Sequence, residues 1–464
     1  MSNIWTTQDL GTVAISVAKL SLGSHGRNPL QRETRLGEQF LTANRTTFKL
    51  YNVVGSLVPT TTGVCVNLRA GSQIGAMALL APDTGKPDFG LVIRPRFGWR
   101  GVGALLSEVG AKLIPQMPRL PALPRSEHEV PKWVLAAVVL TRLEALLLEP
   151  QRKFLSTQVD VSIPRGRIVW NEYVTRCVSR CRPDSIPCAF SELKEDPVLL
   201  GAVHMAVLAQ LNSLQQVKTD SILVARLLAR YESLRQRVSA HAPSWNVLRR
   251  AQSTRLIAST MSDALEAMAW THEQRGLAGQ ADFSGLPWKL SMEEVFEARV
   301  EALAREIARR SGGVVRTGRL RETQRALRWV PAYSGSQRTL LPDVEIVSER
   351  QTIVFDAKYK SHWEEIDSSG WDGTADAVRE AHRADLMQIL AYGATASSDK
   401  VVCVLVYPCK LETWNSLSDR GRTMHTATVS VGSRSLSLVL AAIPFEKQLV
   451  ELAAGFIVRL SAPN

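Results

Sequence analysis

Two aspartates and a lysine near the C-terminus have the residue types and spacing best suited to chemistry. Pro342-Asp343 opens an apolar run, and Ile353-Val-Phe-Asp356-Ala-Lys358 follows a short polar turn. Two such runs predict a β-hairpin. Residues two apart on a strand share a face, so Asp356 and Lys358 should point together. The hairpin can place the Asp343 carboxylate beside that of Asp356.

This arrangement is suited to hydrolysing a phosphodiester with a divalent metal. Two carboxylates offer the hard oxygen ligands that Mg²⁺ binds, and the ion keeps its other positions for water and phosphate. Such an ion, Mg²⁺ or Mn²⁺, would polarise the phosphate and activate water. Lys358 would orient that water or offset charge that builds up in the transition state. The alternative is a solvent-facing hairpin with an Asp–Lys cross-strand pair.

One helix is expected before the hairpin and another after it. Ser291-Met-Glu-Glu294 is a capping box, which predicts that a helix begins there and carries Glu297. Spacing does not separate Glu297 from Glu293 and Glu294 as a third acid, and we choose Glu297. Downstream, Gln388-x-x-x-Tyr392 places both side chains on one helix face.

The combined pattern resembles the PD-(D/E)xK nuclease superfamily. Pro342-Asp343 with Asp356-Ala-Lys358 is similar to its core motif, and Gln388 with Tyr392 is similar to the extra motif of the RecB-like branch. The resemblance implies Asp343, Asp356 and Lys358 as catalytic residues, with Asp343, Asp356 and Glu297 as metal ligands. It implies a supporting role, including holding DNA, for Gln388, Tyr392 and Lys360.

A narrower resemblance is to McrC, the nuclease subunit of modification-dependent restriction systems. It is carried by Asp356-Ala-Lys-Tyr-Lys360 with Asp385–Tyr392, and more weakly by Leu91–Gly98 and Pro164–Ile168. The chain departs from that family in an arginine-rich insertion before the hairpin and in a long loop after Lys360. The resemblance implies a DNA endonuclease that works with a separate AAA+ NTPase. A Gly-x4-Gly-Lys-Ser/Thr motif does not occur in the sequence, which fits a partner that supplies the motor.

Arginine is concentrated just before the hairpin. The chain has 56 Lys and Arg against 44 Asp and Glu, a net charge of +12, and residues 299–328 hold nine arginines and three glutamates. The planar guanidinium suits phosphate, although most charge runs are solvated helix faces. Because this run leads into the hairpin, we favour a surface that guides DNA. The candidate residues are Arg316, Arg319, Arg321, Arg325 and Arg328.

Three regions are expected along the chain. Residues 1–130 predict a β-rich domain, for which the resemblance to McrC implies partner docking. Gln116–Arg125, with three prolines, predicts a stiff linker. Residues 131–285 predict a helical middle domain from apolar residues spaced at three and four. Residues 286–464 predict an α/β nuclease domain around a mixed sheet.

Cysteines and histidines give weaker signals. Cys177, Cys181 and Cys188 could bind zinc, but they lack a CxxC pair and a nearby histidine, so reduced thiols are favoured. His362, His382 and His425 are expected at the surface or in loops, without metal-ligand spacing.

Other functional classes remain open at this point. The sequence shows no signal-peptide pattern at its start and only short apolar runs, so we expect a cytoplasmic protein without a membrane segment. The sequence is also compatible with a homo-oligomer. One alternative function is a stand-alone nuclease acting on DNA ends, recombination intermediates or RNA. Another is a non-catalytic DNA-binding scaffold, which the intact Asp343, Asp356 and Lys358 set argues against.

Overall fold

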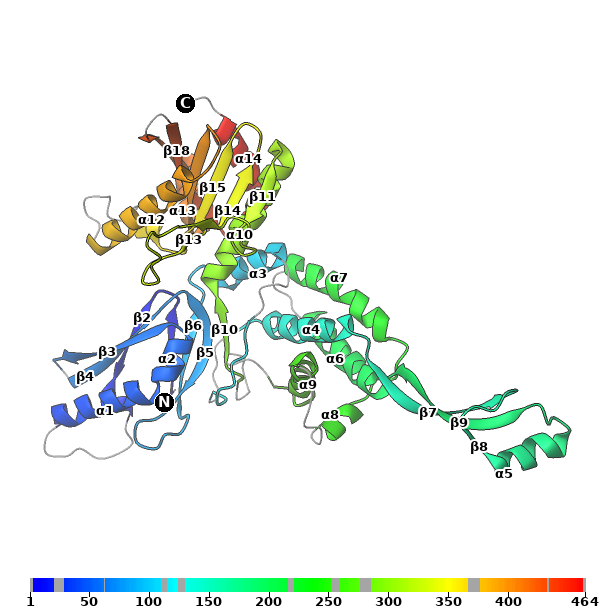
Figure 1. Cartoon of the computed structure of the whole chain (residues 1–464). Coiled ribbons are helices and arrows are strands. Elements are labelled where there is room, and N and C mark those ends of the chain that lie inside the picture. Colours follow the sequence, from blue (N-terminus) through cyan, green and yellow to red (C-terminus); the bar gives the residue numbers. More distant parts are fainter. Residues whose placement is uncertain are drawn as a thin grey trace. The chain divides into compact units, whose positions relative to one another are not determined.

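The fold divides into two compact units, one inserted in the other (Figure 1). The computed structural model describes residues 3–20, 29–61, 63–109, 115–123, 130–215, 221–251, 259–275, 285–365, 376–431 and 434–461. The first unit comprises Met1–Pro131 and Leu277–Asn464, and the second comprises Lys132–Gly276. The first contains the predicted hairpin.

The N-terminal part of the first unit contains two small sheets. Its elements are β1 (Ile4–Gln8), β2 (Thr12–Ser16), η1 (Val17–Leu20), α1 (Pro29–Ala43), α2 (Arg45–Leu50), β3 (Val53–Thr60), β4 (Gly63–Ala70), β5 (Gln73–Leu79), β6 (Phe89–Arg94) and α3 (Gly98–Val109). One sheet has the order β2-β4-β3 and the other β1-β6-β5-β10. The last of these strands, β10 (Trp288–Ser291), comes from beyond the inserted unit and pairs antiparallel with β5. The chain then passes directly from this sheet into helix α10 (Met292–Ser311).

The proline-rich segment, expected to be a stiff linker, is held in place by backbone pairing. Gln116 pairs with Lys289 through two backbone hydrogen bonds of 2.8 and 2.9 Å. Leu123 is fully buried and donates its N–H to Gly285 at 3.0 Å. Prolines do not prevent such pairing where the neighbouring residues supply the donors. The segments that lead into and out of the inserted unit therefore run together.

The C-terminal part of the first unit is built on a six-stranded mixed sheet, so the α/β class is confirmed. Its strand order is β11-β14-β15-β16-β18-β17. Pairing is antiparallel for β11–β14, β14–β15 and β17–β18, and parallel for β15–β16 and β16–β18. The strands are β11 (Val314–Thr317), β14 (Val344–Val347), β15 (Thr352–Ala357), β16 (Val401–Cys409), β17 (Met424–Val431) and β18 (Arg434–Pro444).

Helices cover both faces of this sheet. They are α10 (Met292–Ser311), α12 (Asp376–Ala394), α13 (Leu411–Asp419) and α14 (Leu449–Ser461). On β15, Phe355 contacts Phe456 of α14, whereas Val354 lies in a core cluster with Ile389 of α12. Because neighbouring strand residues point to opposite faces, α14 and α12 lie on opposite sides. Asp356 shares the face of Val354 and so points toward the α12 side.

The inserted unit is helical, as expected, but also contains a long hairpin that the sequence analysis missed. Its helices are α4 (Lys132–Leu148), α6 (Pro197–Gln215), α7 (Ser221–Val238), α8 (Asn246–Ala251) and α9 (Ser259–His272). Between α4 and α6, β7 (Arg152–Val161) and β9 (Ile186–Glu195) pair antiparallel over ten residues. Near the turn lie β8 (Arg167–Ile168) and the short α5 (Trp170–Glu172). We call residues 152–195 the arm.

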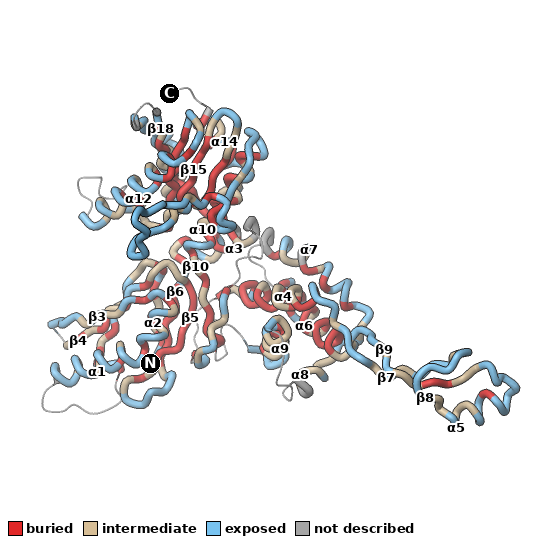
Figure 2. The backbone as a smooth tube through the Cα atoms, viewed as in Figure 1, coloured by how far each residue is buried: buried red, intermediate tan, exposed pale blue. Residues whose placement is uncertain are grey.

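The arm is mostly exposed (Figure 2). It extends away from the helices of its own unit in Figure 1. Cys177 and Cys188 are buried near its tip, whereas Cys181 is exposed, and all three thiols are free. Because neither face of β7 is covered, its sequence lacks the regular apolar alternation that identifies a strand.

Helix α6 is the most apolar long helix among the described residues. By length and composition alone it could cross a membrane, but 61% of its most apolar window is buried inside the protein. It packs against α4, α7 and α9. This burial is what the core helix of a helical domain shows.

Candidate active site

The β14–β15 hairpin brings the two predicted aspartates together. Val344 lies opposite Phe355 in the ladder, so the register continued by one residue sets Asp343 across from Asp356. Asp343 Oδ2 accepts a hydrogen bond of 2.7 Å from the backbone N–H of Ala357. The prediction of a hairpin that juxtaposes these residues is confirmed.

Asp356 is a buried carboxylate whose bonding capacity is incompletely used. Its Oδ2 lies 2.9 Å from Lys358 Nζ, in an ion pair that confirms their shared strand face. Its Oδ1 is buried and has no hydrogen-bond partner among the described residues. Leaving a buried acceptor unsatisfied costs free energy, and structures usually avoid it. This atom is therefore available to a cation or a water.

Burial raises the proton affinity of both aspartates. Burial, followed by the nearby charge of Asp343, raises the pKa of Asp356 above its ordinary value, and Lys358 opposes this rise. Burial also raises the pKa of Asp343, although the Ala357 N–H and Lys358 act against the increase. Two carboxylates in a poorly solvated site favour a shared proton or a bound cation.

Of the three candidate glutamates, Glu297 has the most suitable environment. Ser291 caps α10, since its Oγ accepts from the Glu294 N–H, so the predicted capping box is confirmed. Glu293 and Glu294 are exposed, whereas Glu297 is partly buried. Burial, with the charges of Asp343 and Glu293, raises the pKa of Glu297 to about 7. Glu297 therefore lies within electrostatic range of Asp343.

The acidic groups fit a divalent cation, although they are not gathered into a finished site. Among the residues that the structure describes, no group of three or more His, Cys, Asp or Glu side chains is close enough to hold a metal. Asp343 and Asp356 supply oxygen donors of the hard type, and the unpartnered Oδ1 of Asp356 can accept a cation. Glu297 could complete the set by a side-chain movement.

The Gln388 and Tyr392 pair lies on α12 near the aspartates. Gln388 Nε2 donates to Tyr392 Oη at 2.7 Å, which confirms that they share a face. Tyr392 is buried. Burial raises its pKa, and the charges of Asp356 and Asp343 add to the rise.

Lys360 belongs to a buried polar network that the sequence analysis did not predict. Lys360 Nζ contacts both carboxylate oxygens of Asp385, at 2.7 and 2.6 Å. Tyr407 Oη donates to Asp385 Oδ2 at 2.9 Å and lies 3.0 Å from His382 Nδ1. The ring of His362 stacks on those of His382 and Tyr407, with centroids 4.3 and 4.2 Å away. The network holds the Lys360 ammonium group at Asp385.

The expectation that these histidines lie at the surface was wrong. Both His362 and His382 are buried. Burial, with the neighbouring His382 and Lys360, lowers the pKa of His362 to about 3. The two residues are 20 positions apart and meet only in the folded chain, so local spacing could not reveal the pair.

A second unpredicted cluster joins the segment that follows β15 to the N-terminal part of the same unit. Tyr359 Oη donates to the buried Asp9 Oδ2 at 2.7 Å. Arg96 forms an ion pair with Asp9 at 3.5 Å and also donates to Ser361 Oγ. The guanidinium of Arg96 lies over the Tyr359 ring, 4.6 Å from its centroid. Tyr359 and Ser361, which follow Lys358, are thus tied to the residues just beyond β1 and β6.

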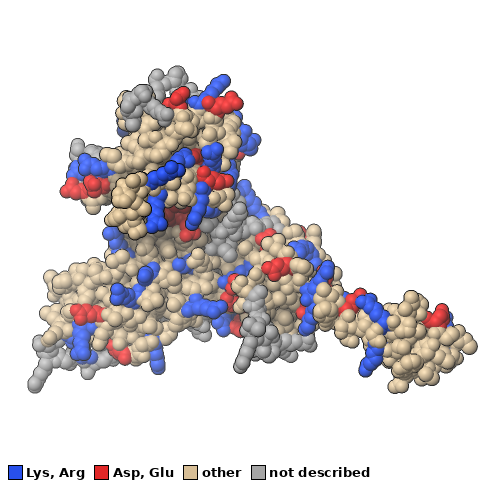
Figure 3. Space-filling model, in the orientation of Figure 1, with Lys and Arg blue, Asp and Glu red and all other residues tan. Residues whose placement is uncertain are grey.

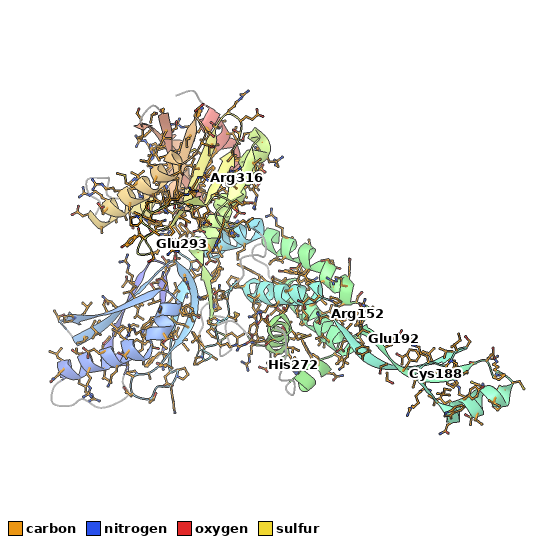
Figure 4. All side chains as sticks on the ribbon, viewed as in Figure 1. Arg152, Cys188, Glu192, His272, Glu293 and Arg316 are labelled. Atoms are coloured by element: carbon orange, nitrogen blue, oxygen red, sulfur yellow. The ribbon has the colours of Figure 1, made fainter. Side chains whose placement is uncertain are left out.

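The arginine-rich stretch divides into paired and exposed residues. Arg325 contacts the buried Glu345 with two hydrogen bonds of 2.7 and 3.0 Å, and Arg319 pairs with Glu301 at 2.8 Å. Arg316, Arg321 and Arg328 are exposed. Figure 3 shows Lys and Arg side chains gathered over the region of β13 (Thr339–Leu340), and Figure 4 labels Arg316 and Glu293.

Part of the arginine-rich stretch lies on α10 and forms a solvated helix face, the alternative considered from the sequence. Arg309 and Arg310 pair with Glu306 of the same helix, and Arg305 pairs with Glu301. Arg299 is fully buried and donates to the backbone carbonyls of Pro444 and Lys447. These four side chains support the helix and its packing.

Comparison with known proteins identifies one family. The model of the McrBC 5-methylcytosine restriction system component matches residues 91–408, more than half of the chain. The match spans the inserted unit as well as the hairpin and α12. No curated protein matches.

Two solved structures from Thermococcus gammatolerans are similar to this chain. A chain of the half-complex of McrB AAA+ hexamers with bound McrC shares 12% identity, covers 98% of this chain and 100% of its own length, and has a TM-score of 0.42. A chain of the McrBC complex shares 15% identity over 66% of this chain and 88% of its own length, with a TM-score of 0.26.

Proposed function

Because the chain belongs to the McrBC 5-methylcytosine restriction system component family, we propose that it is the metal-dependent DNA endonuclease subunit of a cytoplasmic McrBC-like defence system. The observation that carries the proposal is the buried Asp356, paired with Lys358, beside Asp343, with one carboxylate oxygen unpartnered among the described residues. A solvent-facing Asp–Lys pair would need none of this burial. The proposal places the site in the RecB-like branch of the PD-(D/E)xK superfamily.

The side chains would divide the chemistry between them. Asp343, Asp356 and Glu297 would hold Mg²⁺ or Mn²⁺, which when bound supplies Lewis-acid activation for phosphodiester hydrolysis. Lys358, held by Asp356, would hydrogen-bond the attacking water or a non-bridging phosphate oxygen, where negative charge increases. Tyr392, oriented by Gln388, would position the DNA backbone at the site.

The exposed arginines give the DNA a basic surface next to these residues. Three of these arginines can contact phosphates, namely Arg316, Arg321 and Arg328. Each is exposed, and none forms an ion pair among the described residues, in contrast to Arg319 and Arg325. Arg319 and Arg325 would contribute by holding this segment through Glu301 and Glu345. Contacts of this kind bind DNA without reading its sequence.

Target choice would then come from a partner, for which we propose an AAA+ NTPase. The T. gammatolerans half-complex contains McrB AAA+ hexamers with bound McrC, which supports this partner class. The arm offers a docking surface, because it exposes seven large apolar side chains. They are Phe154, Val159, Ile163, Trp170, Val174, Val178 and Leu193.

The N-terminal part, the docking module expected from the sequence, exposes fewer such side chains among its described residues. They are Leu30, Val54 and Val58. Clustered exposed apolar side chains mark interaction sites more often than scattered ones. We therefore propose the arm as the main docking surface.

A cleavage assay tests the proposed function. Purified protein, alone and with the AAA+ NTPase proposed as its partner, is incubated with plasmid and linear DNA in Mg²⁺, Mn²⁺ or EDTA. We expect cleavage that requires the metal and is lost in Asp343→Asn and Asp356→Asn. Cleavage that persists in both variants would place the site elsewhere, and no cleavage under any condition would favour a scaffold role.

The stand-alone nuclease remains a second candidate because Gln388 and Tyr392 are suited to holding DNA ends. It predicts efficient cleavage of linear DNA or RNA without the NTPase. Equal rates with and without the partner would favour it.

A further inference from the structure

The hairpin formed by β12 (Arg325–Ala326) and β13 (Thr339–Leu340) carries Arg325 and Arg328, but its aromatic side chains have no part in the function proposed so far. Its root is fixed beside a catalytic residue. The buried Thr323 donates its Oγ1 hydrogen to the carbonyl of Pro342 at 2.6 Å, and the Gly318 N–H donates to the carbonyl of Asp343 at 2.8 Å. The bidentate Arg325–Glu345 pair adds a third attachment. A side chain on this hairpin therefore has a defined position relative to Asp343.

The tip of the hairpin exposes aromatic and aliphatic surface. Trp329 is 44% exposed, Tyr333 58% and Val330 93%. The Trp329 indole N–H donates to the Gln337 carbonyl at 2.9 Å, and its ring meets that of Tyr333 edge to face with centroids 6.1 Å apart. The two rings are oriented by each other and by the hairpin backbone. Both rings remain exposed to solvent.

The charge around these rings is strongly positive. Residues 314–341 contain six arginines and one glutamate, a net charge of +5 (6 − 1). Arg328 and Arg338 lie on the hairpin itself and are exposed. A docking surface for a protein usually combines aromatic residues with a mixed polar rim. Aromatic rings interleaved with arginines match a nucleic-acid strand instead, because bases stack on rings and arginines bind phosphates.

We propose that Trp329 and Tyr333 stack on an unpaired nucleobase next to the scissile phosphate, so that the nuclease acts on DNA with a locally opened base pair. The inference rests on the proposed nuclease function and names the form of its substrate. The hairpin holds the displaced base while the arginines hold the backbone on either side. Opening a base pair costs least at a mismatch or in single-stranded DNA. Duplex DNA would need a partner, or strain, to open it.

Binding in EDTA tests this without requiring cleavage. Fluorescence anisotropy of the full-length protein is measured with a fully paired duplex, the same duplex with a central three-base bubble, and the single strand. A 2-aminopurine in the bubble reports stacking directly. We expect the wild type to prefer the bubble and the single strand, and to quench the 2-aminopurine.

The test variant is Trp329→Leu/Tyr333→Leu. Its affinity for the bubble and the single strand should fall by roughly ten- to a hundred-fold, the scale of one or two base–aromatic stacks, and its affinity for duplex by less than about three-fold. Trp329→Phe/Tyr333→Phe keeps two rings and should retain most of the preference. Val458→Ser, which changes an exposed apolar side chain on α14, is the control and should leave DNA binding unchanged.

Several outcomes would overturn the inference. One is an equal loss on all three DNAs in the leucine variant, which would indicate a folding defect or a general phosphate contact. Another is unchanged DNA binding together with weaker binding to the NTPase, which would make the hairpin a protein contact. If metal-dependent cleavage is present but the base preference is absent, only this inference fails. If the preference is present but the protein never cleaves, only the proposed function fails.

Discussion

The β14–β15 hairpin and the arm are both antiparallel strand pairs, yet they are buried in opposite ways. Every residue of β15 is buried, including Asp356. The arm is mostly exposed, and its paired residues Phe154 and Leu193 are 70% and 48% exposed. One hairpin buries charge and the other exposes apolar surface. Each arrangement is unfavourable in isolation, because buried charge loses hydration and exposed apolar surface orders water.

The difference indicates where this chain meets its ligands. A buried acid with an unpartnered oxygen gains stability when a cation binds, and an exposed apolar strand gains it when a partner covers it. The two regions should therefore be separable by mutation: changes in β14–β15 should affect the chemistry, and changes in the arm should affect assembly.

The largest expected effect is that of removing the lysine. Lys358→Met should lower the cleavage rate by about 10²–10³-fold, because one charge-stabilising group at a transition state has roughly this value. Binding to the NTPase should not change. Initial rates of plasmid cleavage and a pull-down with the NTPase measure the two properties. A variant that lost both equally would show that the regions are not independent.

Polar substitutions in the arm should give the reverse result. Phe154→Ser/Leu193→Ser removes a cross-strand apolar pair from the surface and should weaken NTPase binding by about ten- to a hundred-fold. Cleavage by the isolated protein, where present, should be unaffected. Leu30→Ser/Val54→Ser is the matched control in the N-terminal part. Isothermal titration calorimetry with the NTPase decides between the two surfaces, and a larger loss in the control would place docking in the N-terminal part.

The buried network behind the site should have an intermediate effect. Asp385→Asn removes the ionic partner of Lys360 and weakens the Tyr407 contact, so the free energy of unfolding should fall by about 1–3 kcal/mol. Glu380→Gln on the same helix, which breaks only the exposed pair with Arg383, should cost less than about 0.5 kcal/mol. Chemical denaturation compares them. Equal stabilities would mean that the network is not structural.

The smallest effect is a pH-dependent one at Glu297. Because its pKa in the folded protein is raised to about 7, the neutral carboxyl is favoured on folding. That stability is present at pH values below the unfolded pKa and is lost as the pH rises toward 7. Glu297→Gln in EDTA should therefore be more stable than the wild type by about 1–2 kcal/mol at pH 8 and nearly equal to it at pH 4. Denaturation midpoints of both proteins, measured at pH 4 and at pH 8, test this. The same stability difference between variant and wild type at both pH values would contradict the prediction.

The parts predicted well from the sequence are those set by local patterns. The strand pair at Asp343 and Asp356 follows from alternation and a turn, and the α10 cap follows from Ser291 and Glu294. The Asp385–Tyr407 network and the Asp9–Tyr359 contact join residues that are far apart in the chain. The strands of the arm were not predicted because they have no continuous buried face, so apolar and polar residues do not alternate regularly along them. Charge counting likewise could not tell that Arg325 is held by Glu345 while Arg328 is exposed.

Metal binding by the apo protein tests the central claim most directly, since it needs neither DNA nor a partner. Mn²⁺ is titrated into the wild type and Asp356→Asn at pH 8, with bound ion measured by electron paramagnetic resonance. We expect one Mn²⁺ site in the wild type and at least about a ten-fold lower affinity in the variant. Equal affinity in both proteins would contradict the claim that Asp356 binds the metal.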